Sequence, residues 1–186
     1  MAFIKVIQPE NATGKLASIY EDLISSRGKL AEVHKIQSLN PESIVKHMDL
    51  YMELMYGKSP LRRYQREMLG VVVSLTNKCE YCQIHHLEAL KNFWTESNHL
   101  EHFISGNWKT FLSEKDLNLC FYAENLTREP SANERKKWIE DLKKTGCDDR
   151  EILDASLIIS YFNFVNRLVL GLGVDLEKEP GGYNYK

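Results

Sequence analysis

Long apolar runs, paired cysteine repeats and a leader segment are all missing from this sequence. Apolar stretches such as Leu168–Leu172 are too short to span a bilayer. The four cysteines are too few for a disulfide scaffold in a chain of 186 residues, and a reducing compartment keeps such residues mostly as thiols. The start has no basic leader followed by an apolar stretch and a small-residue cleavage site. The sequence therefore predicts a cytoplasmic protein with no membrane partner.

The sequence also lacks a concentration of charge of one sign. Lys and Arg number 24 and Asp and Glu number 26, which gives a net charge of −2. No segment gathers Lys and Arg on one face with interleaved aromatic residues, which argues against nucleic acid as a partner. No glycine-rich phosphate loop and no flavin or nicotinamide signature is present, so no bound cofactor is expected.

Strand alternation is absent beyond a short extended stretch at Phe3–Ile7, whereas helix start and stop signals recur. Asn40-Pro41 and Ser59-Pro60 each place a capping residue before a proline suited to the first helical position. Ser131-x-x-Glu134 has the spacing of a capping box. The predicted helices cover 13–26, 40–56, 59–76, 79–94, 98–104, 113–128, 131–146 and 148–170.

These signals predict an all-α fold in a single domain over 1–186, which is long enough to bury a continuous core. Residues 1–58 supply N-terminal helices, and 176–186, with Pro180-Gly181-Gly182, form a loosely held tail. The helix over 40–56 is apolar around much of its circumference. It is either buried inside its own subunit or shared between the core and a second subunit.

Two cysteines at Cys-x-x-Cys spacing carry the clearest chemical signal. Asn77 and Lys78 interrupt the preceding apolar helix, so Cys79 and Cys82 fall at the first turn of the next helix. The free backbone N–H groups and the helix dipole stabilise an anion at such a position, and thiols there have lowered pKa values. A spacing of three residues places both sulfurs on one helix face, close enough to join.

Two further residues complete a candidate site around the dithiol. His86 lies four residues after Cys82 and so follows on the same face one turn later. Glu67 lies twelve residues before Cys79, and an antiparallel helix hairpin returns it toward the thiols. A carboxylate that orients an imidazole beside a thiol is the arrangement that moves a proton off sulfur. His85 points about 100° away from His86 in helical geometry and is the weaker candidate.

Other interpretations of the dithiol stay open at this stage. Cys79, Cys82, His86 and Glu67 could surround a zinc ion, although Cys120 and Cys147 are isolated and offer no second ligand pair. The two cysteines could also be buried without a chemical role. A thioredoxin-like fold offers the same Cys-x-x-Cys spacing, but it requires alternating strands and helices that this chain lacks.

The pattern Glu-x(11)-Cys-x-x-Cys-x-x-x-His in an all-helical chain resembles the alkylhydroperoxidase D-like branch of the carboxymuconolactone decarboxylase family. The resemblance extends over Glu134–Gly146, Glu151–Ala155, Tyr161–Leu168 and Gly171–Val174, which are similar to the peroxidase-related subgroup. It covers most of the chain from Ser59 to Leu176. It implies an alkylhydroperoxidase D-like helical bundle with the dithiol at the N-terminus of a core helix.

The resemblance also implies roles. Cys82 is expected to attack a peroxide and become a sulfenic acid, Cys79 to resolve it to a disulfide, and Glu67 with His86 to take the activating proton. A separate reductant, such as a lipoyl-bearing or thioredoxin-like protein or a small thiol, is expected to supply electrons. Family members assemble as oligomers, so a homo-oligomer (dimer, trimer or hexamer) is expected. The alternative is a dithiol redox or metal-binding sensor without peroxidase turnover.

One residue departs from the family pattern. The best-known members carry a second histidine immediately before the second cysteine, where this chain has Tyr81, which cannot act as a base near neutral pH. Farther along, the polar residues Asn163, Asn166 and Arg167 interrupt an apolar helix. They are interpreted either as buried hydrogen-bond partners that fix helix packing or as part of the cavity beside the dithiol.

Overall fold

The computed structural model describes residues 2–96 and 98–183. Over these residues it contains helices and no strand, which confirms the predicted all-α fold. The extended stretch at Phe3 does not pair as a strand; its N–H donates to the carbonyl of Leu172 at 2.9 Å. The α-helices are α1 Gly14–Arg27, α2 Glu32–Lys35, α3 Pro41–Tyr56, α4 Arg63–Thr76, α5 Glu80–Leu90, α6 His99–Ile104, α7 Glu114–Arg128, α8 Arg135–Lys144 and α9 Asp149–Leu172.

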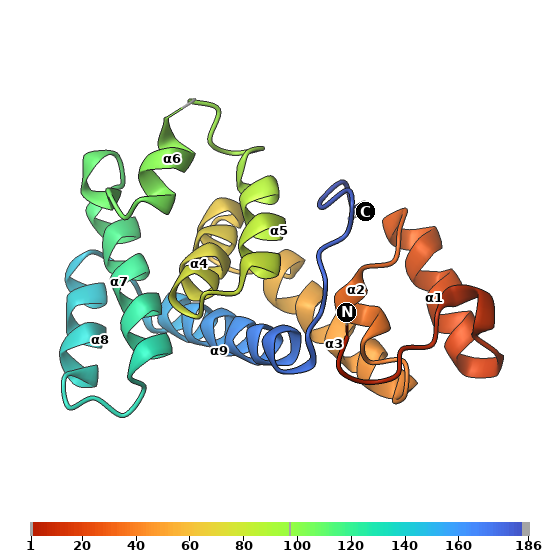
Figure 1. The fold of residues 1–186 in the computed structure, drawn as a ribbon. Coiled ribbons are helices and arrows are strands. Elements are labelled where there is room, and N and C mark those ends of the chain that lie inside the picture. Colours follow the sequence, from red (N-terminus) through yellow and green to blue (C-terminus); the bar gives the residue numbers. More distant parts are fainter. Residues whose placement is uncertain (1, 97, 184–186) are drawn as a thin grey trace.

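Helix α4 lies at the centre of the fold, packed against α5, α7 and α9 (Figure 1). Its second half, from Met68 to Leu75, is almost entirely apolar, and the polar Gln65, Arg66 and Glu67 of its first half are buried with hydrogen-bond or ion-pair partners. Met68, Leu69, Val71 and Val73 are each fully buried. The site residues of α4 and α5 are therefore anchored to the least exposed part of the protein.

The N-terminal helices form a smaller unit at the side of this core. Leu16, Ile19, Tyr20, Leu23 and Ile44 make a separate apolar cluster between α1 and α3, and α3 also packs against α4 and α9. In Figure 1, α1 lies at the edge of the molecule farthest from α7 and α8. Leu50 on α3 remains 46% exposed, and burial of this helix against a second subunit stays a prediction.

Two predicted helix starts are wrong. Ser59-Pro60 does not begin a helix, because the Ser59 hydroxyl accepts from the Leu61 N–H at 3.1 Å and donates to Asp154 at 2.5 Å, which forms a turn. Helix α4 therefore begins at Arg63. Ser131 is not a capping residue either, since Glu134 occupies the cap of α8 and accepts no side-chain cap bond.

A capping box is present at the start of α9, where Asp148 Oδ1 accepts from the Glu151 N–H at 2.8 Å and Glu151 Oε2 accepts from the Asp148 N–H at 3.0 Å.

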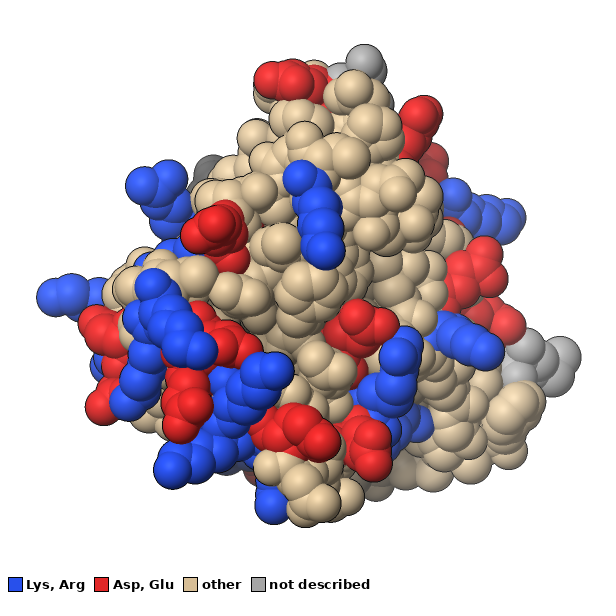
Figure 2. Space-filling view, turned by 90° about the vertical axis from the view of Figure 1, so that its left-hand side faces the viewer, with Lys and Arg blue, Asp and Glu red and all other residues tan. Residues whose placement is uncertain are grey.

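Helix α9 is long and apolar enough, by length and composition alone, to cross a membrane, with 44% of its most apolar window buried. The core helix of a soluble protein meets the same criterion. On the face shown in Figure 2, charged side chains of both signs are interspersed.

Candidate functional site

The turn between α4 and α5 fixes the position of Cys79. The Cys79 N–H donates to Ser74 O at 2.9 Å and the Lys78 N–H to Leu75 O at 3.1 Å, which is the pair of bonds that defines a Schellman motif. Lys78 takes the left-handed conformation that this motif requires, with φ 58°. The same turn that ends α4 thus makes Cys79 the N-cap of α5, as the sequence predicts.

The two thiols are adjacent but differ in access. Their Sγ atoms lie 2.8 Å apart, and both cysteines are buried, Cys79 at 0% and Cys82 at 2% exposure. Among the described residues, Cys82 belongs to the wall of a cavity of about 550 Å³, and Cys79 does not. Of the two cysteines, a molecule in the cavity therefore meets only Cys82.

Burial and hydrogen bonding separate the acidities of the two thiols. Hydrogen bonds between the two thiols and from the Cys82 backbone lower the pKa of Cys79, although burial opposes this. The pKa of Cys82 is raised by its hydrogen bond with the Cys79 thiol and by burial, while a hydrogen bond from Asn166 acts in the other direction. Of the two thiols, Cys79 is therefore the more acidic.

Glu67 and His86 are in direct contact, as the helix-hairpin hypothesis predicts. Glu67 Oε2 lies 2.6 Å from His86 Nδ1, and Glu67 Oε1 pairs with Arg63 at 2.5 Å. Burial disfavours ionisation of this 1% exposed residue, but contacts with His86 and Arg63 outweigh burial and lower the pKa of Glu67. An ionised Glu67 can only accept, so Nδ1 of His86 carries the proton and Nε2 is left as a proton acceptor.

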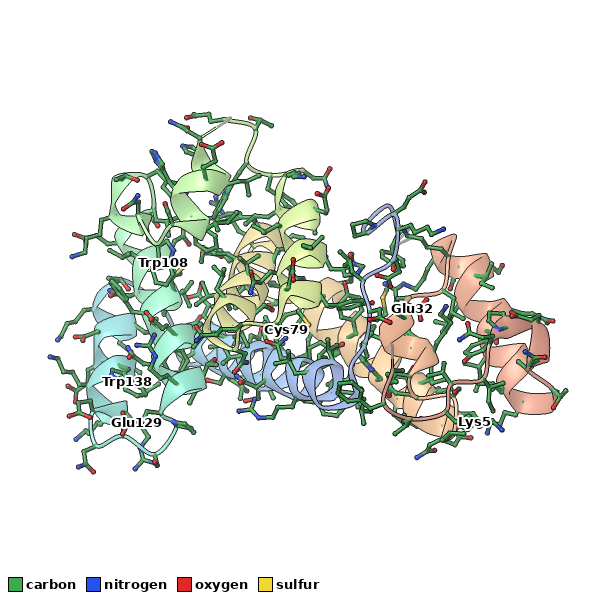
Figure 3. The ribbon with its side chains drawn as sticks, in the orientation of Figure 1. Lys5, Glu32, Cys79, Trp108, Glu129 and Trp138 are labelled. Atoms are coloured by element: carbon green, nitrogen blue, oxygen red, sulfur yellow. The ribbon has the colours of Figure 1, made fainter. Side chains whose placement is uncertain are left out.

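Figure 3 labels Cys79 at the end of α5 that faces α9, in the middle of the helical core. Rings from several helices and from the segments after α5 and α9 surround the adjoining cavity. Among them are the aromatic residues Tyr51, Tyr56, Tyr81, Phe93, Tyr161, Phe162 and Tyr183 and the histidines His34, His47, His85 and His86. The site is thus a mostly apolar chamber with a few polar groups, which is typical of binding sites for small organic molecules.

Two histidines of the cavity were not singled out by the sequence. His47 Nε2 bonds the Tyr161 hydroxyl at 2.7 Å, and its Nδ1 accepts from Gln37 at 2.8 Å. Burial, reinforced by the charge of Arg27, lowers the pKa of His47 to about 4 and that of His34 well below its usual range. Both imidazoles are therefore uncharged near neutral pH. Each stands alone in the sequence, and no local spacing could have indicated them.

The hydroxyl of Tyr81 does not take over the role of the missing family histidine. It donates to Glu177 at 2.7 Å and accepts from the Val33 N–H at 3.2 Å. Burial, together with the charge of Glu177, raises the pKa of Tyr81. The hydroxyl is hydrogen-bonded to Glu177 and to the Val33 N–H, so Tyr81 anchors the segment after α9 and does not transfer protons to or from the thiols.

Glu177 holds the first part of the expected loose tail against α2 and α5, and Gly181, Gly182 and Tyr183 farther along line the cavity. Its carboxylate accepts from Tyr81, from the Glu32 N–H at 2.8 Å and from His85 Nε2 at 2.8 Å. These donors outweigh burial and lower the pKa of Glu177 to about 2. In Figure 1 this segment runs between α5 and α2. The last part of the predicted tail, 184–186, lies outside the described residues.

The polar residues of α9 fix helix packing and are not part of the cavity wall. Asn77 Nδ2 donates to Asn163 at 3.0 Å and to Asn166 at 3.1 Å, and exposed Arg167 donates to Asn163 at 2.7 Å. Asn166 differs from the other two because it is fully buried and also forms a hydrogen bond with the thiol of Cys82. In the part of the chain that the structure describes, no three His, Cys, Asp or Glu side chains gather as a metal-ligand set.

Comparisons with known proteins agree with this architecture. Residues 45–95 match the model of the carboxymuconolactone decarboxylase family. The crystal structure of an uncharacterized peroxidase-related protein from Silicibacter sp. TM1040 matches with a TM-score of 0.79 and 25% identity, over 94% of this chain and 88% of that chain. An alkylhydroperoxidase AhpD core protein from Ralstonia eutropha JMP134 matches with a TM-score of 0.81 and 18% identity, over 95% and 93%.

The debrominase Bmp8 has the same fold, with a TM-score of 0.78 and 16% identity over 95% of this chain and 92% of that chain. A search of curated proteins finds no match. The chain therefore has the all-helical fold of alkylhydroperoxidase D-like proteins. The resemblance to the carboxymuconolactone decarboxylase family is confirmed, and the matched segment holds α4, α5 and all four residues of the predicted site.

Proposed function

We propose that this protein is a thiol-dependent peroxidase that reduces an organic hydroperoxide with the Cys79–Cys82 dithiol. One observation carries the proposal. A buried pair of thiols 2.8 Å apart opens through Cys82 onto a cavity whose wall also holds His86 and its partner Glu67. A nucleophile, a base and a group that orients the base are the parts that covalent catalysis requires.

The first half of the proposed cycle consumes the peroxide. His86 accepts the first proton of the pair at Nε2, and the second proton, shared between the sulfurs, stays on Cys79 when Cys82 attacks. The Cys82 sulfur forms a bond to the terminal peroxide oxygen, the O–O bond breaks, and its electron pair goes to the departing oxygen, which takes a proton and leaves as an alcohol. Cys82 is left as a sulfenic acid.

The order of the two acidities does not conflict with attack by Cys82. The pKa of Cys79 is lowered and that of Cys82 is raised, but only Cys82 lines the cavity. The two sulfurs are 2.8 Å apart, so a proton can pass from Cys82 to Cys79. The reaction then proceeds through the form in which Cys82 is the thiolate. The hydrogen bond from Asn166 stabilises that form.

The second half forms the disulfide. The Cys79 sulfur attacks the Cys82 sulfur, the S–S bond forms, and the departing hydroxide takes the Cys79 proton and leaves as water. An external dithiol, either a lipoyl-bearing or thioredoxin-like protein or a small thiol, then reduces the disulfide. The chain supplies both redox groups itself, so the proposed cycle uses no bound cofactor.

The test is a single-turnover thiol titration. Reduced protein is mixed with one equivalent of cumene hydroperoxide, and free thiols and cumyl alcohol are measured. We expect each chain to lose two thiols and to form one molecule of alcohol, and the thiols to return when a dithiol is added. Neither Cys82→Ser nor Cys79→Ser should form the disulfide. Cys120→Ser, which changes a buried thiol outside the pair, is the matched control. Unchanged thiols after hours would overturn the proposal and favour a sensor or binding role.

A second candidate reaction uses the same thiols. The cavity is larger than a small peroxide needs and is lined by aromatic rings, and a cysteine-to-alanine variant of the debrominase Bmp8, with 15% identity to this chain, binds 2,3,4-tribromopyrrole. Two thiols can supply the two electrons that replace a ring bromine by hydrogen, with release of bromide and formation of a disulfide. Bromide release from tribromopyrrole, measured against loss of two thiols, distinguishes this reaction from peroxide reduction.

A further inference from the structure

A second carboxylate–histidine pair, besides Glu67 and His86, places its histidine in the cavity wall. His85 Nε2 lies 2.8 Å from Glu177 Oε2, and both histidines belong to the wall that also holds Cys82. His85 follows Cys82 by three residues and His86 follows it by four, and both spacings bring side chains together on a helix. Two oriented imidazoles therefore lie within about one helical turn of Cys82 along α5.

The two imidazoles cannot occupy the same place. Successive residues of a helix point about 100° apart, and His86 is pressed edge-on against Phe162 at 4.3 Å between ring centroids. His85 instead lies against Tyr81, at 4.5 Å. One imidazole thus stands on the α9 side of Cys82 and the other on the side of the segment that follows α9.

Peroxide cleavage needs proton transfer at two separate positions. The sulfur, the attacked oxygen and the departing oxygen lie in line during displacement, so the departing oxygen is farther from the sulfur than the attacked one. A base beside the sulfur and an acid farther along the wall meet these two needs with separate groups. His86 with Glu67 supplies the base.

We propose that His85, oriented by Glu177, is the catalytic acid that protonates the departing oxygen of an organic hydroperoxide. The inference rests on the proposed peroxidase function and deepens it. Ionised Glu177 accepts the proton at Nε2, so the proton transferred is the one on Nδ1 of the imidazolium. It moves to the departing alkoxide to give the alcohol, and His86 retains the proton taken from the thiols, so the total charge of the site is unchanged.

Two oxidants test this role. An alkyl hydroperoxide such as cumene hydroperoxide releases an alkoxide, which needs a proton, whereas peracetic acid releases acetate, which does not. We expect His85→Gln to slow single-turnover thiol oxidation by cumene hydroperoxide by about 100-fold, the lower range for general acid catalysis, and to leave the rate with peracetic acid unchanged. Glu177→Gln is expected to show the same selectivity with a smaller loss.

Two control variants separate this role from a structural one. His86→Gln should slow both oxidants, because the base is needed for both, and His102→Gln, which is distant in sequence on α6, should slow neither. Equal losses with both oxidants in His85→Gln, or no loss with either, would overturn the assignment of His85 alone. Absence of thiol loss in the unmodified protein would overturn the proposed peroxidase function itself.

Discussion

Gly70 on α4 leaves the space that the ring of His86 occupies. A Cβ atom on Gly70 would lie 3.2 Å from His86 Cγ and 2.9 Å from Phe162 Cε2, which is closer than neighbouring groups tolerate without moving. A glycine inside a helix lowers stability by about 1 kcal/mol relative to alanine. The cost is offset here because the absent side chain allows α5 and α9 to place His86 against Phe162 beside the thiols.

Gly70→Ala is therefore expected to lower both stability and thiol reactivity. The displaced rings should cost about 1–3 kcal/mol of overpacking, more than the gain in helix propensity, and His86 should move out of register with Cys82. Urea unfolding and single-turnover thiol oxidation measure the two effects. Gly171→Ala is the control, because a Cβ atom there meets nothing within 4 Å; a stable, fully reactive Gly70→Ala protein would contradict the prediction.

Lys78→Gly is expected to stabilise the protein. Lys78 has φ 58°, a conformation that costs a non-glycine residue about 1 kcal/mol, and glycine removes this cost at the expense of some unfolded-state entropy. The expected net gain is about 0.5 kcal/mol, measured by urea unfolding. Lys78→Ala removes the same charge but keeps the strain, so a similar gain in both variants would show that charge, and not backbone conformation, is responsible.

Glu177 is expected to make stability depend on pH in the acidic range. Its pKa is lowered to about 2 in the folded protein from an ordinary value of 4.5, so its contribution is full above pH 4.5 and is lost as pH falls toward 2. Glu177→Gln should cost about 2 kcal/mol at pH 7 and progressively less below pH 4.5. Urea unfolding at several pH values tests this; a difference between the two proteins that stays constant with pH would contradict it.

His47 is expected to make folding stability depend on pH in a higher range than Glu177, because its proton is bound by the unfolded chain and not by the folded one. Its folded pKa is about 4, below its ordinary value of 6.5, so between these values the unfolded chain binds a proton that the folded chain does not. Stability should therefore fall by about 1–3 kcal/mol as pH drops through this window. His47→Gln should reduce this loss between pH 6.5 and 4, as followed by thermal unfolding; an equal slope in both proteins would assign the loss to other groups.

The sequence predicts the dithiol site because its signals are local. Cys79, Cys82 and His86 lie on one helix at helical spacing, and the reversal at Asn77 and Lys78 returns Glu67 to them. The second pair could not be predicted in this way, because His85 and Glu177 are 92 residues apart and a lone glutamate after a helix carries no spacing signal. Its place depends on how the segment after α9 crosses α5.

Helix ends differ in the same respect. Asp148 with Glu151 forms a capping box, and Ser131 with Glu134 has the same spacing but does not. The spacing alone does not decide between them, because Glu134 itself takes a helical conformation and occupies the cap. Similarly, the hydroxyl of Ser59 donates to Asp154 on α9. This tertiary contact holds Ser59 in a turn, so α4 begins only at Arg63.

The cavity wall contains Cys82 and not Cys79, and this imposes an order of events on the proposed cycle. A reductant that uses this entrance can form its mixed disulfide only with Cys82, and Cys79 becomes the leaving thiolate, for which its lowered pKa suits it. Peroxide and reductant would then compete for binding in the same cavity. The expected kinetics are ping-pong, with each substrate inhibiting the reaction when it is in large excess over the other.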